Sequence, residues 1–143
     1  MKQISSIMIV DAQGGGLGRQ LVTAVKKELP GLHVIAVGTN TAATAAMLKA
    51  GADEAATGEN AVIVVCRRAD VIIGPIGMVI ADSMLGEITP KMAAAVAQAD
   101  ARRILIPFSN CDNIIVGVAD YSMTGLLSEA LEELKKLIDV DPS

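Results

Sequence analysis

Residues 14–18 form a glycine cluster whose composition and position favour the binding of an anion. Four of these five residues are glycine, and the cluster joins an apolar run at residues 4–10 to a periodic segment that follows Gly18. Glycine exposes backbone N–H groups without a Cβ in front of them, and the amino end of a helix carries partial positive charge. We therefore expect a phosphate-binding site at this junction. Its candidate residues are Asp11, Gln13, Gly14, Gly15, Gly16, Leu17, Gly18 and Arg19.

Arg19 is a second, independent indication of an anion. It falls in the first turn of the expected helix, where the helix dipole disfavours a cation unless a bound anion offsets it. Asp11 has two open interpretations, because its carboxylate is placed either to cap the loop or to accept a hydroxyl group of the ligand.

Glycine and small polar residues also follow the other expected strands. Ligands of doubly wound sheets bind beside the carboxyl ends of the strands, so residues at these ends should flank the glycine cluster. The second strand is followed by Gly38, Thr39 and Asn40, the third by Gly74, Pro75, Ile76 and Gly77, and the fourth by Ser109, Asn110, Cys111 and Asp112.

The glycine cluster matches no standard nucleotide fingerprint. A G-x-G-x-x-G motif in register with Gly18 would need glycine where Gln13 stands, and the G-K-[ST] of a P-loop is absent. The acid that closes the second strand of NAD-binding domains and holds a ribose hydroxyl is replaced by Gly38, Thr39 and Asn40. The alternative that the glycines serve only tight packing of strand and helix stays open, as does a purely structural Gly-Pro turn at residues 74–77.

Other reactive side chains are scattered. A Cys–His pair is not expected, because Cys111 and the single histidine, His33, lie far apart in the sequence. Cys66 lies on an apolar run and is expected in the core. Asp82 and Glu87 are possible site acids, although helix capping explains Glu87 equally well. No cluster of His, Cys, Asp and Glu has the spacing of a metal site, so none is predicted.

The apolar periodicity predicts a doubly wound α/β domain with a five-stranded sheet. Strands are expected at residues 4–10, 32–37, 70–74, 103–108 and 114–118, with helices at 19–29, 41–49, 61–66, 77–85, 89–99 and 122–138. The strand, helix and strand of residues 4–37 have the length of one βαβ unit, which predicts parallel pairing. Five residues between the last two strands are too few for a parallel crossover, so the fifth strand should be an antiparallel edge. Residues 53–54 are interpreted as a solvated turn.

Composition indicates one cytoplasmic domain over residues 1–143. One tyrosine, one phenylalanine, no tryptophan and a net charge of −4 disfavour nucleic acid as a partner. The longest charge-free apolar stretch, residues 71–81, is shorter than the roughly 20 residues of a membrane span, and no secretory leader or cysteine framework is visible. The apolar residues of 77–85 and 92–99 exceed what two short helices can bury, which predicts a homo-oligomer, most simply a dimer.

Several motifs together resemble a small bacterial family known only as a domain of unknown function. They are Asp11-x-Gln13-Gly14-Gly15-Gly16-x-Gly18, Gly38-Thr39-Asn40, Thr57-Gly58-Glu59-Asn60, Gly74-Pro75-Ile76-Gly77 and Leu85-Gly86-Glu87-Ile88-Thr89-Pro90. The resemblance covers nearly the whole chain and implies a cytoplasmic, Rossmann-like domain, but no activity. The glycine loop alone is similar to that of short-chain NAD(P)-binding reductases, whose Tyr-x-x-x-Lys pair is lacking because Gly125 stands four residues after Tyr121.

Three functions are compatible with these patterns. The leading hypothesis is a domain that binds a nucleotide, NAD(P) or a phosphorylated metabolite at the glycine cluster. The second is a small enzyme, NAD(P)-dependent or acting on a phosphorylated substrate, that uses the same cleft. The third is a structural oligomer subunit without a ligand.

Overall fold

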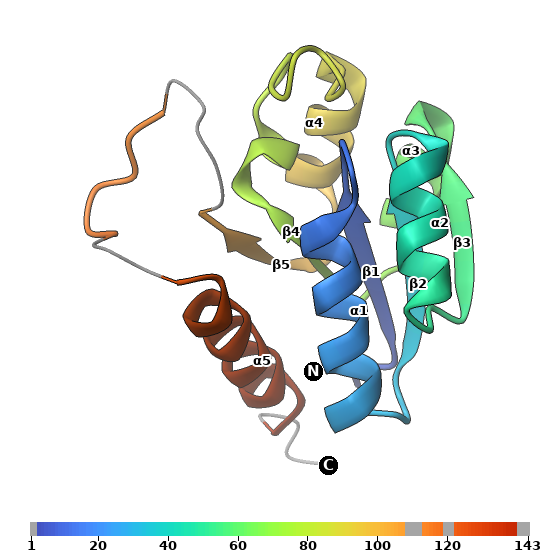
Figure 1. Cartoon of the computed structure of the whole chain (residues 1–143), viewed down its shortest axis with the longest axis vertical. Coiled ribbons are helices and arrows are strands. Elements are labelled where there is room, and N and C mark those ends of the chain that lie inside the picture. The colour runs from blue at the N-terminus through green and yellow to red at the C-terminus, as the bar shows by residue number, and fades with distance from the viewer. Residues whose placement is uncertain (1–2, 108–112, 119–121, 140–143) are drawn as a thin grey trace.

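A single parallel sheet of five strands forms the centre of the molecule (Figure 1). The computed structural model describes residues 3–107, 113–118 and 122–139. The strands are β1 (Ser6–Asp11), β2 (His33–Gly38), β3 (Glu54–Thr57), β4 (Val71–Pro75) and β5 (Arg102–Ile106). They lie in the order β3-β2-β1-β4-β5, and every pair is parallel. Ile7 of the central strand β1 pairs with Val34 on one side and with Val71 on the other.

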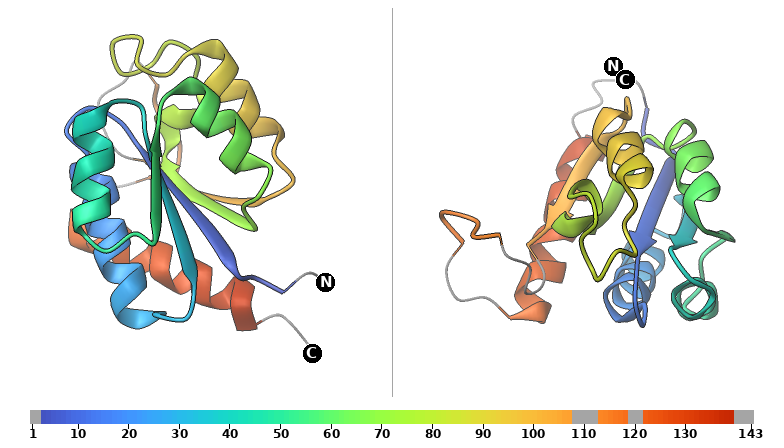
Figure 2. Two further views of the ribbon diagram at one scale, coloured as in Figure 1. Left: turned by 90° about the vertical axis from the view of Figure 1, so that its right-hand side faces the viewer. Right: turned by 90° about the horizontal axis from the view of Figure 1, so that it is seen from above.

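Helices cover both faces of this sheet, as Figure 2 shows. One layer contains α1 (Gly16–Glu28), α2 (Thr41–Lys49) and α5 (Met123–Asp139), and the other contains α3 (Glu59–Cys66), the 3₁₀ helix η1 (Ile76–Val79) and α4 (Pro90–Gln98). The fully buried residues of β1 alternate between the layers: Ile7 and Ile9 contact the first, Met8 and Val10 the second. A strand buried on both faces reads as a continuous apolar run, which is why β1 was recognisable in the sequence.

The prediction of an antiparallel edge strand is wrong. Residues 113–118 belong to no strand, and the side chains of Ile114 and Val116 are 91% and 93% exposed. The fifth strand is instead β3, which pairs in parallel with β2 and begins within the segment interpreted as a turn. Its four residues, EAAT, are short and partly exposed, so they carry no apolar signal. The crossover through α2 is long enough for the parallel pairing of β2 with β3, which forms one edge of the sheet.

Two smaller expectations also change around β4. Pro75 does not break the strand but is its last residue. A helix over residues 77–85 does not form, because Asp82, Met84 and Leu85 have φ angles of 64°, 55° and 57° and the chain makes a loop after η1.

The helix expected at residues 61–66 is confirmed as part of α3, and Cys66 is buried in the core. Among the residues described, no helix is long and apolar enough to cross a membrane.

The strand order creates a switch point beside β1. The chain runs outward from β1 through β2 to β3, then returns to β4 on the other side of β1. The loops that follow β1 and β4 therefore diverge to opposite sides, and open sheets of this kind bind ligands in the crevice at such a point.

Candidate anion-binding site

The loop from β1 to α1 lies at the carboxyl edge of the sheet, and two of its glycines are required by packing. Gly15 has a φ of 75°, and a Cβ on it would lie 2.8 Å from Cα of Ala43. A Cβ on Gly18 would lie 2.5 Å from Sδ of Met47 and 2.8 Å from Cβ of Asp11. These two glycines therefore let the start of α1 approach β1 and α2 closely.

The other two glycines are open to solvent. Gly14 and Gly16 are exposed, and a Cβ on either would meet no atom within 4 Å. The backbone N–H groups of Gly14, Gly16 and Leu17 have no acceptor within the described ranges. Helix α1 has no side-chain cap at Gly15, so these donors at its amino end are available to an anion.

Asp11 holds the loop in place rather than pointing out of it. Its carboxylate is buried, with Oδ1 accepting from the Ala12 N–H at 2.8 Å and Oδ2 accepting from the Gly18 N–H at 2.6 Å. Burial raises the pKa of this carboxyl, the two hydrogen bonds oppose the rise, and the nearby charge of Glu87 adds to it. Of the two interpretations of Asp11, this geometry supports loop capping.

Glu87 brings a second carboxylate to the loop from a distant part of the chain. Its Oε1 accepts from the Gln13 N–H at 2.8 Å, from Oγ1 of Thr39 at 2.6 Å and from Nδ2 of Asn40 at 2.9 Å. Burial raises the pKa of the Glu87 carboxyl, but the three hydrogen bonds outweigh it and hold the pKa below its usual value. Glu87 does not cap α4, because the Thr89 hydroxyl accepts from the Met92 N–H there.

Asn40 links the parts of this cluster. Its Nδ2 also donates to the Gln13 carbonyl at 2.9 Å, and its Oδ1 accepts from the Ala43 N–H and so caps α2. Thr39 and Asn40 thus lie beside the glycine loop, at the carboxyl end of β2. The sequence placed both residues at this edge, but nothing local in it indicated that they bind Glu87.

The segment from Gly74 to Gly77 is covered rather than open. A Cβ on Gly74 would lie 2.7 Å from the Val10 carbonyl oxygen, and the Ser83 hydroxyl donates to the Gly77 carbonyl at 2.6 Å. Pro75 is buried and Ile76 is partly buried. The loop of residues 80–88 therefore packs over Gly77, and it carries Glu87 to the end of β2.

The remaining reactive residues lie elsewhere. Asp82 is exposed, and Cys111 and its neighbours at 108–112 lie outside the described residues. His33 stands at the start of β2, at the opposite edge, with Nε2 2.6 Å from Oε2 of Glu54. Burial raises the pKa of the Cys66 thiol to about 11. Within the described part of the chain, no group of three His, Cys, Asp or Glu residues could hold a metal ion.

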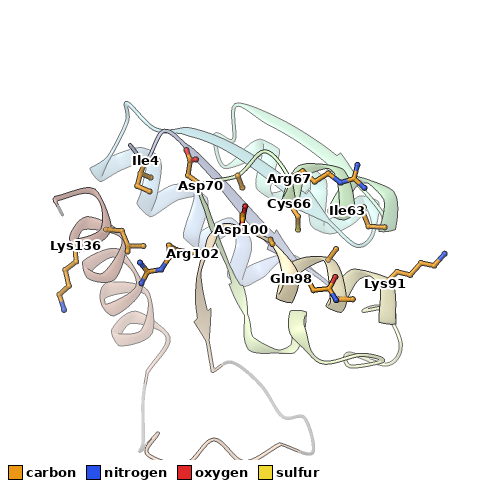
Figure 3. Close-up of a pocket in the computed structure, with 15 residues that line it drawn as sticks. Ile4, Ile63, Cys66, Arg67, Asp70, Lys91, Gln98, Asp100, Arg102 and Lys136 are labelled. Atoms are coloured by element: carbon orange, nitrogen blue, oxygen red, sulfur yellow. The ribbon is translucent and has the colours of Figure 1, made fainter. Parts of the chain in front are cut away.

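A hollow of about 1060 Å³ lies at the amino ends of β4 and β5 (Figure 3). Its walls include short alanine side chains of α4, and Lys91 and Lys136 point away from it. Asp70 at its margin accepts from the Ser5 and Ser6 N–H groups at 2.9 and 3.0 Å, and so joins the starts of β1 and β4. This edge is opposite to the one where open parallel sheets bind ligands, and we therefore place the candidate site at the glycine loop.

Comparisons with known proteins identify a family but no activity. One similar solved structure is the dodecameric FMN-dependent Ubix-like decarboxylase from Escherichia coli O157:H7, with 16% sequence identity and a TM-score of 0.45 over 92% of this chain and 75% of that chain. No curated protein matches the sequence. The family model described as Domain of unknown function (DUF3842) matches residues 6–139, from β1 to the end of α5. The chain therefore belongs to the DUF3842 family.

Proposed function

We propose that the protein binds a small phosphate-containing molecule, a nucleotide such as NAD(P) or a phosphorylated metabolite, at the loop between β1 and α1. The observation that carries this proposal is the set of three N–H groups, on Gly14, Gly16 and Leu17, that have no acceptor among the described residues at the amino end of α1. Phosphate oxygens accept hydrogen bonds from such donors, and the helix dipole favours their negative charge.

Two further features support an anionic ligand. The guanidinium group of Arg19 is exposed in the first turns of α1, and it forms no ion pair with the residues described. The open space in front of Gly14 and Gly16 allows a ligand to approach the backbone directly. Gly15 and Gly18 serve packing, so the two explanations of the glycine cluster apply to different glycines.

The test is binding of phosphate compounds by the full chain. Isothermal titration and thermal-shift assays would use pyrophosphate, ADP and NAD, with Gly16→Val as the test variant and Gly31→Val as its control. Both positions are open and have ordinary backbone angles, but Gly31 lies in the turn before β2. We expect Gly16→Val to lose binding, because its side chain would fill the space in front of the N–H groups, and Gly31→Val to bind normally.

Failure of all three compounds to bind or stabilise the wild-type protein at millimolar concentration would contradict the proposal. The structural-subunit hypothesis would then be preferred. The enzyme hypothesis gains less support from the geometry, since both oxygens of Asp11 are already engaged in holding the loop.

We also propose that the chain forms a homo-oligomer through residues 113–118. Of the expected surplus at 77–85 and 92–99, Met78, Met92 and Val96 are buried, whereas Leu85 is 99% exposed. Residues 113–118 add further exposed apolar side chains, with Ile114 and Val116 91% and 93% exposed. Light scattering should show a dimer or larger assembly that Val116→Asp dissociates, whereas a monomer at micromolar concentration would refute it.

A further inference from the structure

The carboxylate of Glu87 occupies the end of β2, although Glu87 belongs to the loop before α4. Three donors hold its Oε1: the Gln13 N–H, the Thr39 hydroxyl and the Asn40 amide, at 2.8, 2.6 and 2.9 Å. These donors come from the loop after β1 and from the residues that follow β2. The side chain is therefore held beside the proposed phosphate loop by both strand ends at once.

The second carboxylate oxygen has a different environment. Oε2 of Glu87 accepts no hydrogen bond from the residues described, and the side chain is partly exposed. Because the hydrogen bonds to Oε1 hold the pKa of Glu87 below its usual value, the group is ionised at neutral pH. Oε2 is thus a charged acceptor in a defined position, open to a donor from outside the protein.

The loop that delivers Glu87 adopts an unfavourable backbone conformation. Asp82, Met84 and Leu85 all have positive φ angles, which side-chain-bearing residues rarely adopt. Two hydrogen bonds retain this shape, from the Ser83 hydroxyl to the Gly77 carbonyl at 2.6 Å and from the Asp82 N–H to the Ile88 carbonyl at 2.7 Å. Such strain concentrates at functional sites, where the surrounding structure maintains it.

In dinucleotide-binding sheets, a carboxylate at the end of the second strand accepts a ribose hydroxyl while the pyrophosphate lies on the first loop. Here β2 is followed by Thr39 and Asn40 and has no acid of its own. We infer that Glu87 takes this part: its Oε2 accepts a hydrogen bond from a sugar hydroxyl of a ribonucleotide whose phosphate binds at Gly14, Gly16 and Leu17. The inference rests on the proposed phosphate site and narrows its ligand to nucleotides with free ribose hydroxyls.

The same carboxylate sets a second preference. A phosphate group on the ribose would place negative charge against Glu87, and like charges in contact repel. The site should therefore bind NAD in preference to NADP. Because the dideoxy analogue of ADP lacks the hydroxyl that Glu87 would accept from, the site should also bind ADP in preference to this analogue.

Calorimetric titration of the full chain tests the inference with ADP and dideoxyadenosine diphosphate, and with pyrophosphate as the ligand without a sugar. The test variant is Glu87→Gln, whose amide oxygen still accepts from the three donors while an NH₂ group replaces Oε2. The matched control is Asp82→Asn, which removes one negative charge from an exposed position in the same loop. Asparagine tolerates the φ of 64° at this position.

We expect wild type and Asp82→Asn to bind ADP at least about tenfold more tightly than the dideoxy analogue, the effect of one charge-assisted hydrogen bond. In Glu87→Gln this ratio should fall close to one, with pyrophosphate binding retained. Equal binding of the two nucleotides by wild type, or an unchanged ratio in Glu87→Gln, would overturn the inference and leave the phosphate site standing. If neither the nucleotides nor pyrophosphate bind, the proposed function itself fails.

Discussion

Replacing Gly18 by alanine should destabilise the fold, whereas the same change at Gly16 should not. Both glycines lie in the first turn of α1, so both variants gain the same advantage of alanine over glycine in a helix, at most about 1 kcal/mol. Only at Gly18 would the new Cβ collide, at 2.5 Å from Sδ of Met47 and 2.8 Å from Cβ of Asp11. The difference between the two variants therefore isolates the packing contact.

The cost at Gly18 follows from what can move. The Met47 side chain is flexible, but Asp11 is fixed by its hydrogen bonds to the Ala12 and Gly18 N–H groups. Overpacking of a well-filled core costs roughly 1–3 kcal/mol. We expect the free energy of unfolding of Gly18→Ala to be lower than that of Gly16→Ala by this amount. Its thermal unfolding midpoint should be lower by about 2–4 °C for each kcal/mol.

Urea denaturation and calorimetry of both variants measure this difference. Equal stability of the two variants would refute the reasoning, since it would mean that α1 can move away from β1 without loss. A Gly16→Ala variant destabilised by more than about 1 kcal/mol would show that the position is not open, because that loss exceeds the scatter of neutral surface substitutions.

Three further predictions concern stability and reactivity. The hydrogen bond from the Val34 N–H, and next the one from Lys26, lower the pKa of Asp53 below 3.8. The ionised Asp53 carboxylate therefore stabilises the fold above pH 3.8, and this stabilisation is lost as pH falls through the lowered pKa. The free energy of unfolding should accordingly fall more steeply with acid in wild type than in Asp53→Asn. Asn40→Ala removes the cap of α2 and a donor to the Glu87 carboxylate, and urea unfolding should show a loss of about 1 kcal/mol; unchanged stability would contradict the capping role. Burial raises the pKa of the Cys66 thiol to about 11. Peptide mapping after iodoacetamide treatment at pH 8 should therefore find this thiol unmodified in the native protein and modified after unfolding. Rapid labelling of the native protein would contradict this prediction and show that the core opens.

The sequence alone determined the elements whose signals are local. The apolar run from Ile4 to Val10 predicted β1, because a strand buried on both faces is continuously apolar. The spacing of Leu21 and Val25 predicted α1, because a helix repeats every 3.6 residues. The glycine cluster predicted the loop between them, since few other residues allow so close an approach of helix and strand. Parallel pairing of β1 and β2 followed from the length of their connection.

The tertiary structure decided what depends on residues far apart in the chain. Strand β3 forms because β2 offers its free edge to EAAT, a segment too short and polar to indicate a strand by itself. Which glycines pack and which stay open depends on Met47 and Ala43 of α2. The placement of Glu87 beside Thr39, 48 residues away in sequence, depends on the path of the loop after β4. Patterns in sequence report burial and turn preference along one segment, whereas these contacts arise only when separate segments pack together.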